Sequence, residues 1–199
     1  MKKSTTFLLR LFKYVTGLSL LAIGITCMAL ADMGAAPWDL LAISLSQITF
    51  LTVGQWQIGL NIIMVVVVSL FLTHKIDLTS LIPGVILGFM IDFFMKPLEV
   101  FTFSPIILLT VGIFASGAGI TLYINQKFVA NAIDNFTYQL HRKYKITLDI
   151  AKVLTDFIAV IVILLFFRQY LTIVTLIIYI TIPISIKGWS KIYRTLNII

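Results

Sequence analysis

The stretch MGAAPWDLLAISLSQ, residues 33–47, decides how this sequence folds. It follows a long apolar run and contains no Lys or Arg. Proline suits the first position of a helix, because its missing N–H has no intrahelical partner there. With Pro37 at that position, Asp39 falls in the first turn, where the helix dipole stabilises a carboxylate. We therefore predict a short helix over Trp38–Thr49 that begins next to Pro37.

The composition around this stretch is that of an integral membrane protein. Of the 199 residues, 60% are hydrophobic and only 12% are charged, about half the charge of a soluble domain. The single cysteine, Cys27, excludes an internal disulfide framework. It lies within an apolar run, so we expect it to face lipid or the core.

Six segments are long and apolar enough to cross about 30 Å of hydrocarbon. We expect them to be helices, because lipid offers no hydrogen-bond partner to the backbone. They are Leu11–Ala31, Gln55–Leu72, Leu78–Met95, Pro105–Ile124, Ile150–Phe166 and Leu171–Ile186. Two shorter segments, Trp38–Thr49 and Ala130–Arg142, follow the first and fourth spans. The expected fold is an all-α polytopic protein whose residues 1–199 form a single membrane domain.

The basic residues set the orientation of these spans. With the N-terminus inside, the outer side receives only Lys96 and Arg168 of the 15 Lys and Arg residues. The inner side receives Lys2, Lys3, Arg10, Lys13, Lys75, Lys127, Arg142, Lys143, Lys145, Lys152, Lys187, Lys191 and Arg194. This bias predicts that both termini are cytoplasmic. The net charge of +7 therefore reports topology, and we expect no nucleic-acid partner.

The N-terminal region resembles a signal peptide, with Ala29-Leu30-Ala31 as a cleavage site. Arg10 and Lys13 interrupt its early part, and the uncharged run that follows is longer than a usual signal-peptide core. We therefore expect the first span to be retained.

The chain also repeats itself at an offset of 95 residues. Thirteen of 55 positions are identical when Gly17–Phe71 is laid on Gly112–Phe166 without a gap. The aliphatic identities mean little in this composition, whereas matches of scarce residues such as Gly24 with Gly119 and Thr52 with Thr147 mean more. Removal of the first span would leave the fourth without its counterpart, which again argues against cleavage.

Each repeat, about residues 11–95 and 105–190, contains three spans. An odd number of spans reverses the orientation of the second repeat. The prediction is thus six transmembrane helices as two inverted three-helix repeats, each with a short extra helix after its first span, an arrangement common in secondary transporters.

The two short helices carry matching carboxylates. Asp134 is the repeat counterpart of Asp39, and the topology places Asp39 on the outer side and Asp134 on the inner side. One interpretation is that each aspartate only caps a helix. The other is that both short helices point their N-termini into a central path, as gates or substrate contacts. The two interpretations are compatible.

Other polar groups lie within the predicted spans. Asn61 and Asp156 are repeat counterparts, and Asp92 lies late in the third span. Intramembrane carboxylates are functional candidates because burying them is costly. The alternatives are an i, i+4 ion pair between Lys152 and Asp156 and solvation of Asp92 at the outer interface.

Small residues and aromatic residues have structural interpretations as well. Thr26 and Thr121 match in mid-span, where packing or bonding to their own helix competes with a role in binding. Glycines seven residues apart in both repeats indicate helix packing; they are Gly17, Gly24, Gly112 and Gly119. Trp38, Trp56 and Trp189 fit interfacial anchors, while Trp38 is also placed to stack on an organic substrate.

Several functional classes find no support. His74 and His141 are far apart, no His/Cys/Glu cluster suggests a metal site, and no hydrolase, P-loop or zincin motif occurs. We expect neither an enzyme nor a cofactor.

The residues Gly34-Ala35-Ala36-Pro37-Trp38-Asp39 resemble the YczE/YyaS-like family of bacterial integral membrane proteins. Gly17 and Gly24 upstream and Thr52-Val53-Gly54 downstream extend the resemblance over most of the chain. The second copy departs from it, since Ala132-Ile133-Asp134 lacks the proline and Val129 replaces the glycine. The resemblance implies a six-span protein of the bacterial plasma membrane, in a family mostly described as candidate permeases, and supplies no substrate.

We therefore expect secondary transport of an unknown small solute by alternating access between the repeats. The substrate or gate candidates are Pro37, Trp38, Asp39, Asp134, Thr26 and Thr121, and the coupling-ion candidates are Asp156, Asn61 and Asp92. The alternative is a non-transporting accessory or scaffold protein that supports a membrane-associated partner. The lipid bilayer surrounds the protein in either case, and the small size of each repeat favours a homodimer.

Overall fold

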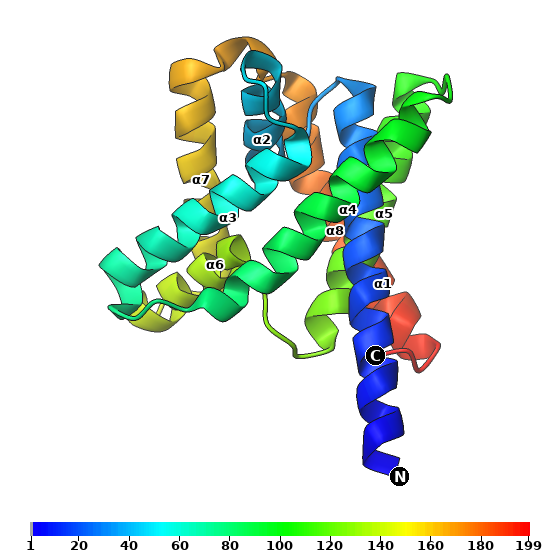
Figure 1. The fold of residues 1–199 in the computed structure, drawn as a ribbon, viewed down its shortest axis with the longest axis vertical. Coiled ribbons are helices and arrows are strands. Elements are labelled where there is room, and N and C mark those ends of the chain that lie inside the picture. The colour runs from blue at the N-terminus through cyan, green and yellow to red at the C-terminus, as the bar shows by residue number, and fades with distance from the viewer. Residues whose placement is uncertain (1) are drawn as a thin grey trace. The chain divides into compact units, whose positions relative to one another are not determined.

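A computed structural model describes residues 2–199, with the side chains of residues 2–6 outside the description. The predicted inner-side charges of Lys2 and Lys3 therefore lie outside the described side chains. Within the described part, every regular element is helical. The α-helices are α1 Lys2–Ala31, α2 Pro37–Ile48, α3 Val53–Val68, α4 Leu81–Glu99, α5 Pro105–Asn125, α6 Ala132–Tyr144, α7 Leu148–Phe166 and α8 Ile173–Thr195 (Figure 1). A π-helical turn, Ser69–Thr73, extends α3, and the 3-10 turns Leu78–Ser80 and Arg168–Tyr170 precede α4 and α8.

Five helical segments of the described chain are long and apolar enough to cross a membrane. They are Phe7–Ala31, Val53–Thr73, Leu78–Glu99, Pro105–Asn125 and Ile173–Thr195. The prediction of an all-helical protein with several helices able to cross a membrane is thus confirmed. The sixth predicted span corresponds to α7, which is not among the five. Its first half carries Asp149, Lys152 and Asp156, which reduces its hydropathy.

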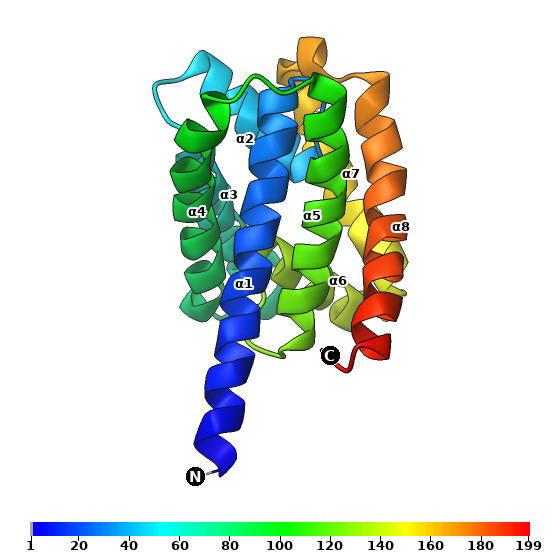
Figure 2. The ribbon, with the colours of Figure 1, turned by 90° about the vertical axis from the view of Figure 1, so that its right-hand side faces the viewer.

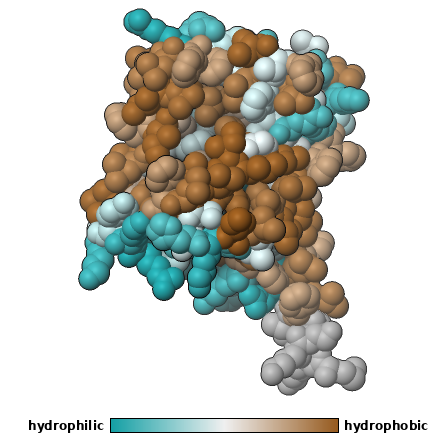
Figure 3. Space-filling view, turned by 60° about the vertical axis from the view of Figure 1, so that its left-hand side comes forward, coloured by the Kyte–Doolittle hydropathy of each residue, from teal (hydrophilic) through white to brown (hydrophobic). Residues whose placement is uncertain are grey.

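The surface supports a lipid environment. Many large apolar side chains are exposed, Phe71 and Phe93 among them. Apolar side chains cover much of the face drawn in Figure 3.

The helices form two compact units, and each unit takes segments from both halves of the chain. Unit 1 contains residues 1–35, 93–128 and 173–199, and unit 2 contains residues 36–92 and 129–172. Unit 1 therefore holds α1, α5, α8 and the end of α4. Unit 2 holds α2, α3, α6, α7 and most of α4.

In unit 1, α5 packs against both α1 and α8 (Figure 2). The α1–α5 contact is close because glycines face each other across it. A Cβ atom on Gly24 would lie 2.8 Å from the carbonyl oxygen of Gly112, and one on Gly17 would lie 3.0 Å from that of Gly119. The interpretation of these glycines as packing residues is confirmed. At the offset of 95, Gly17 corresponds to Gly112 and Gly24 to Gly119. In the contact, Gly17 therefore meets the counterpart of Gly24, and Gly24 meets the counterpart of Gly17.

In unit 2, α2 packs against α3 and α7, and α6 packs against α7 and α3. Helix starts follow the repeat closely. Thr52 caps α3, accepting the N–H of Gln55 at 3.1 Å, and its counterpart Thr147 caps α7, accepting the N–H of Ile150 at 3.4 Å. The first residues of α2 and α6 differ by 95 positions, as do those of α3 and α7. In unit 2 each helix of one half of the chain thus packs against a helix of the other half, α2 against α7 and α3 against α6.

Candidate functional site

The candidate site begins with α2 in unit 2. Pro37 is the first residue of α2, as predicted, and Ala36 before it makes no side-chain cap. Asp39 is therefore in the first turn, where it is partly buried. Its Oδ1 accepts a hydrogen bond of 3.3 Å from Nε2 of Gln57, one turn into α3. The carboxylate at the start of α2 is thus held by the neighbouring helix.

Asn61 connects α3 to the start of α6. It is fully buried, and its Nδ2 donates to the carbonyl oxygen of Gln57 at 2.8 Å. Its Oδ1 accepts the backbone N–H of Ala132, the first residue of α6, at 3.0 Å. Gly84 of α4 lies against this side chain, because a Cβ atom there would come within 2.6 Å of the Asn61 Cγ. Asn61 therefore satisfies one of the free N–H groups at the start of α6.

Asp134 occupies the same place in α6 as Asp39 does in α2. The backbone N–H of Asp134 donates to Oδ1 of Asn131 at 2.8 Å, so Asn131 caps this helix. Since α6 has a cap in Asn131, the Asp134 carboxylate is not needed for that role.

Helix α7 contributes the third carboxylate together with a cation. Nζ of Lys152 lies 2.8 Å from Oδ1 of Asp156. The Asp156 side chain is 5% exposed, whereas that of Lys152 is 48% exposed. The predicted i, i+4 ion pair is therefore present.

Positions 95 residues apart carry different chemistry in α3 and α7. Gln57 corresponds to Lys152 and Asn61 to Asp156 at the offset of 95. Asn61 binds the N–H at the start of α6, but the equivalent residue of α2 is Pro37, which has no N–H to offer. The carboxylate of Asp156 pairs with Lys152 instead. Unit 2 is therefore asymmetric at the point where its helices meet.

The charges of this cluster act on one another. Burial raises the pKa of Asp39 to about 7. Lys152 and the hydrogen bond from Gln57 lower this pKa, while the carboxylates of Asp156 and Asp134 raise it. The aspartates of three different helices and one lysine thus form one electrostatic group, with three carboxylates against one ammonium.

Buried polar atoms without a partner lie on the helices that hold Asp39. Within the described residues, Trp38 Nε1, Ser44 Oγ and Gln57 Oε1 are buried and make no hydrogen bond. Buried polar atoms are usually paired. These three give the cluster an unused donor, an unused hydroxyl and an unused acceptor. The sequence singled out Trp38 but neither Ser44 nor Gln57. The match of Gln57 with Lys152 at the repeat offset was the available signal.

Other predicted residues lie elsewhere. Asp92 binds the start of α3, accepting from Thr52 Oγ1 at 2.6 Å and from the N–H of Gly54 at 2.9 Å. Thr26 and Thr121 belong to unit 1 and are buried there. Thr121 donates to the carbonyl oxygen of Gly117 at 2.8 Å, the back-bonding that was one of its predicted roles. None of these three belongs to the cluster on α2, α3, α6 and α7.

No group of three or more His, Cys, Asp or Glu side chains in the described part of the chain could hold a metal ion. The cluster combines carboxylates, amides, one ammonium and an indole. It is suited to bind a small polar solute or to exchange a proton.

Comparison with known proteins gives a family but no activity. A family model described as "Family of unknown function (DUF6198)" matches residues 8–191. The chain is 28% identical over 129 residues to "Uncharacterized protein YyaS" of Bacillus subtilis (strain 168), an alignment that covers 62% of this chain and 64% of the relative. It is 32% identical over 134 residues to "Uncharacterized membrane protein YczE" of the same organism, covering 65% and 62%. The chain thus spans less than two thirds of either relative. No solved structure matches. The resemblance to YczE and YyaS drawn from the sequence is confirmed.

Proposed function

The chain belongs to this DUF6198 family of unknown function, and from the geometry of unit 2 we propose that it is a secondary transporter of a small solute. The observation that carries the proposal is the electrostatic influence on Asp39, in the first turn of the short helix α2, of Asp134 in the first turn of α6 and of the Lys152–Asp156 pair on α7. Breaks that aim helix starts at one point are typical of transporter binding sites. Intramembrane ionisable groups of this kind are kept for function more often than for stability.

Inverted repeats are the second part of the proposal. The matching starts of α2 with α6 and of α3 with α7 support them, and so does the exchange of partners, in which α2 packs on α7 while α6 packs on α3. With α7 as the sixth span, both termini lie in the cytoplasm and the protein lies in the bacterial plasma membrane. The positive-inside bias supports this topology.

Alternating access follows from the same arrangement. The helices α2 and α3 come from the first repeat, and α6 and α7 come from the second. Movement of one pair against the other opens the path past Asp39 to one side and the path past Asp134 to the other. The Lys152–Asp156 pair on α7 and Asn61 on α3 belong to these two moving helix pairs. Asp39 and Asp156 are the two carboxylates that bind the coupling proton. The pKa of Asp39 lies at about 7.

The experiment measures access to both gates while leaving their aspartates in place. In a Cys27→Ala background, Ala36→Cys reports on the start of α2 and Asn135→Cys on the start of α6. Right-side-out and inside-out vesicles are treated with a membrane-impermeant maleimide. Lys75→Cys and Thr102→Cys serve as controls, each of which labels from one side only.

If the protein is a transporter, the reagent labels both reporter cysteines from both sides of the membrane. Asp39→Asn then changes the ratio of labelling from the two sides. If each reporter labels from one side only and Asp39→Asn changes nothing, the transport proposal fails. Asp39 then serves only as a hydrogen-bond partner of Gln57 in the first turn of α2, a role that the asparagine carbonyl also fills. That outcome favours the accessory or scaffold role.

A further inference from the structure

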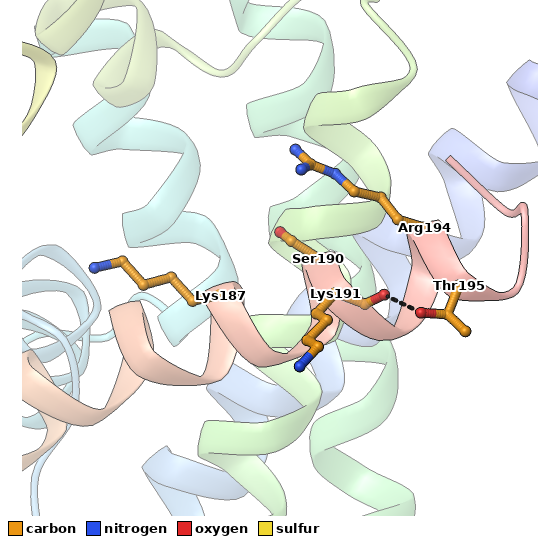
Figure 4. A pocket seen from close by; sticks show the side chains of 5 residues that line it. All are labelled: Lys187, Ser190, Lys191, Arg194 and Thr195. Atoms are coloured by element: carbon orange, nitrogen blue, oxygen red, sulfur yellow. Dashed lines mark hydrogen bonds between the residues drawn. The ribbon is translucent and has the colours of Figure 1, made fainter.

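The last turns of α8 in unit 1 carry a cationic face that the proposed transport site does not use. Lys187, Ser190, Lys191, Arg194 and Thr195 line a shallow pocket of about 460 Å³. Figure 4 shows these side chains on successive turns of α8. Thr195 Oγ1 donates to the carbonyl oxygen of Lys191 at 3.0 Å. The Ser190 hydroxyl makes no hydrogen bond within the described residues.

The protein does not neutralise these cations itself. Among the described residues, no carboxylate lies within ion-pair distance of Lys187, Lys191 or Arg194. Helix α8 contains no Asp or Glu, and like charges at i, i+4 repel each other. Two other cations of unit 1 are engaged: Arg10 donates to the carbonyl oxygen of Gln126, and Lys13 donates to that of Ile198 at 2.7 Å. These three cations of α8 are therefore unpaired among the described residues.

The same face of α8 is apolar further toward its N-terminus. Ile173, Ile177, Ile180 and Ile184 are each more than half exposed. Their spacing of four, three and four residues continues directly into Lys187, Lys191 and Arg194. From Ile173 to Ile184 the stripe rises about 16 Å, roughly the thickness of one leaflet's hydrocarbon. A soluble anion would leave these isoleucine side chains uncovered, whereas the acyl chain of a lipid would pack against them.

We propose that this face of α8 binds an anionic phospholipid. The phosphate lies over Lys187, Lys191 and Arg194 with Ser190 as a further donor, and an acyl chain follows the isoleucine stripe. Lys187 lies about 21 Å along the helix from Ile173, so its ammonium reaches headgroup level by extending along the helix, as lysines near membrane interfaces do. Basic pockets at the cytoplasmic ends of spans suit such headgroups. This inference is independent of transport.

Trp189 is a reporter close to the site, because it adjoins Ser190 in the chain. Its ring packs against the buried cluster of Ala118, Leu122 and Tyr193, 5.3 Å from the Tyr193 ring. The protein with Trp38→Phe and Trp56→Phe keeps only this tryptophan. It is reconstituted in phosphatidylcholine vesicles that contain either dibrominated phosphatidylglycerol or dibrominated phosphatidylcholine at equal bromine content. Bromine quenches indole fluorescence at short range, so the quenching reports which lipid occupies the face.

We expect brominated phosphatidylglycerol to quench Trp189 more strongly. Each basic residue at a membrane surface contributes about fivefold to anion affinity. For three residues this gives about 100-fold, so the triple variant Lys187→Gln, Lys191→Gln, Arg194→Gln should lose the preference for phosphatidylglycerol. The charge-matched control Lys75→Gln, Arg142→Gln, Lys143→Gln, in unit 2, should keep it. All six residues are exposed or partly exposed, so both variants are expected to fold, which circular dichroism checks.

Two results overturn the proposal. The first is equal quenching by both lipids, or a preference that survives in the triple variant. The second is displacement of the brominated lipid by millimolar inorganic phosphate, which assigns the face to a soluble anion. Binding to an acidic protein segment also predicts equal quenching by the two lipids.

Discussion

The side chain of Asn61 accepts the backbone N–H of Ala132 at 3.0 Å, although the two residues are 71 positions apart in the chain. The same amide donates to Gln57, whose own side chain donates to Asp39. One line of hydrogen bonds therefore connects the start of α6 to the first turn of α2. Helix α3 thus contacts the starts of both short helices through Gln57 and Asn61.

Removing the Asn61 side chain should destabilise unit 2. Asn61→Ala leaves the buried N–H of Ala132 without a partner, and such a loss costs about 1–3 kcal/mol. Thermal unfolding in detergent measures the effect. The control Asn135→Ala removes a partly buried amide that only accepts from Gln139 at 3.3 Å, so we expect less than about 0.5 kcal/mol. Equal effects of the two substitutions would contradict the role of Asn61.

Asp39 should make stability depend on pH. Its pKa rises from 3.8 to about 7 on folding, so between these values the folded state binds more protons than the unfolded state. Stability from this group is therefore largest at low pH and falls as pH rises through that window, by at most about 1.4 kcal/mol per pH unit. Above about pH 7 the loss is complete. Lys152 opposes the effect, and Asp134 and Asp156 add to it.

Asp39→Asn should remove this slope between pH 4 and 7, while Asp149→Asn, an exposed residue on α7, should keep it. Melting temperatures recorded across pH 4–8.5 test the prediction. A slope that persists in Asp39→Asn assigns the pH dependence to another group.

The sequence was sufficient for features that depend on local chemistry. Pro37 marked the start of α2, because proline is tolerated only where its missing N–H costs nothing. The spacing of Lys152 and Asp156 predicted their ion pair. Gly24 and Gly119 indicated close helix packing, since only a small residue allows backbones to approach.

Features that depend on partners across the chain were not predictable. Periodicity shows which face of a helix is buried but not which helix covers it. The bonds from Gln57 to Asp39 and from Asn61 to Ala132 needed the packing of α3 against α2 and α6. The sixth span was predicted from the apolar second half of α7, whereas Asp149, Lys152 and Asp156 in its first half set it apart from the five apolar spans.

The α1–α5 contact in unit 1 should be intolerant of one added methyl group. In Gly24→Ala, the new Cβ would lie 2.7 Å from the Ser116 nitrogen and 2.8 Å from the Gly112 oxygen. Both atoms belong to the backbone, so the helices must separate, at about 1–3 kcal/mol. Gly188→Ala is the matched control, because nothing lies within 4 Å of its Cβ position. We expect that variant to be neutral or more stable by up to about 1 kcal/mol. A melting temperature equally lowered in both variants would argue against the close contact.

The most informative variants give α7 the residues that α3 carries 95 positions earlier in the chain. Lys152→Gln leaves Asp156, only 5% exposed, without its cation, and we expect a loss of about 2–4 kcal/mol. Asp156→Asn leaves a half-exposed lysine that water solvates, so its effect should be about 1 kcal/mol or less.

The double variant Lys152→Gln, Asp156→Asn places on α7 the same pair that Gln57 and Asn61 form on α3. Because it leaves no unpaired buried charge, it should be more stable than Lys152→Gln alone. A double-mutant cycle in thermal unfolding gives the coupling energy. Additive effects of the two substitutions would show that the pair contributes nothing to the fold. If stability is recovered while two-sided labelling at Ala36→Cys and Asn135→Cys is lost, the asymmetry between the repeats serves transport, because only the charge that distinguishes them has been removed.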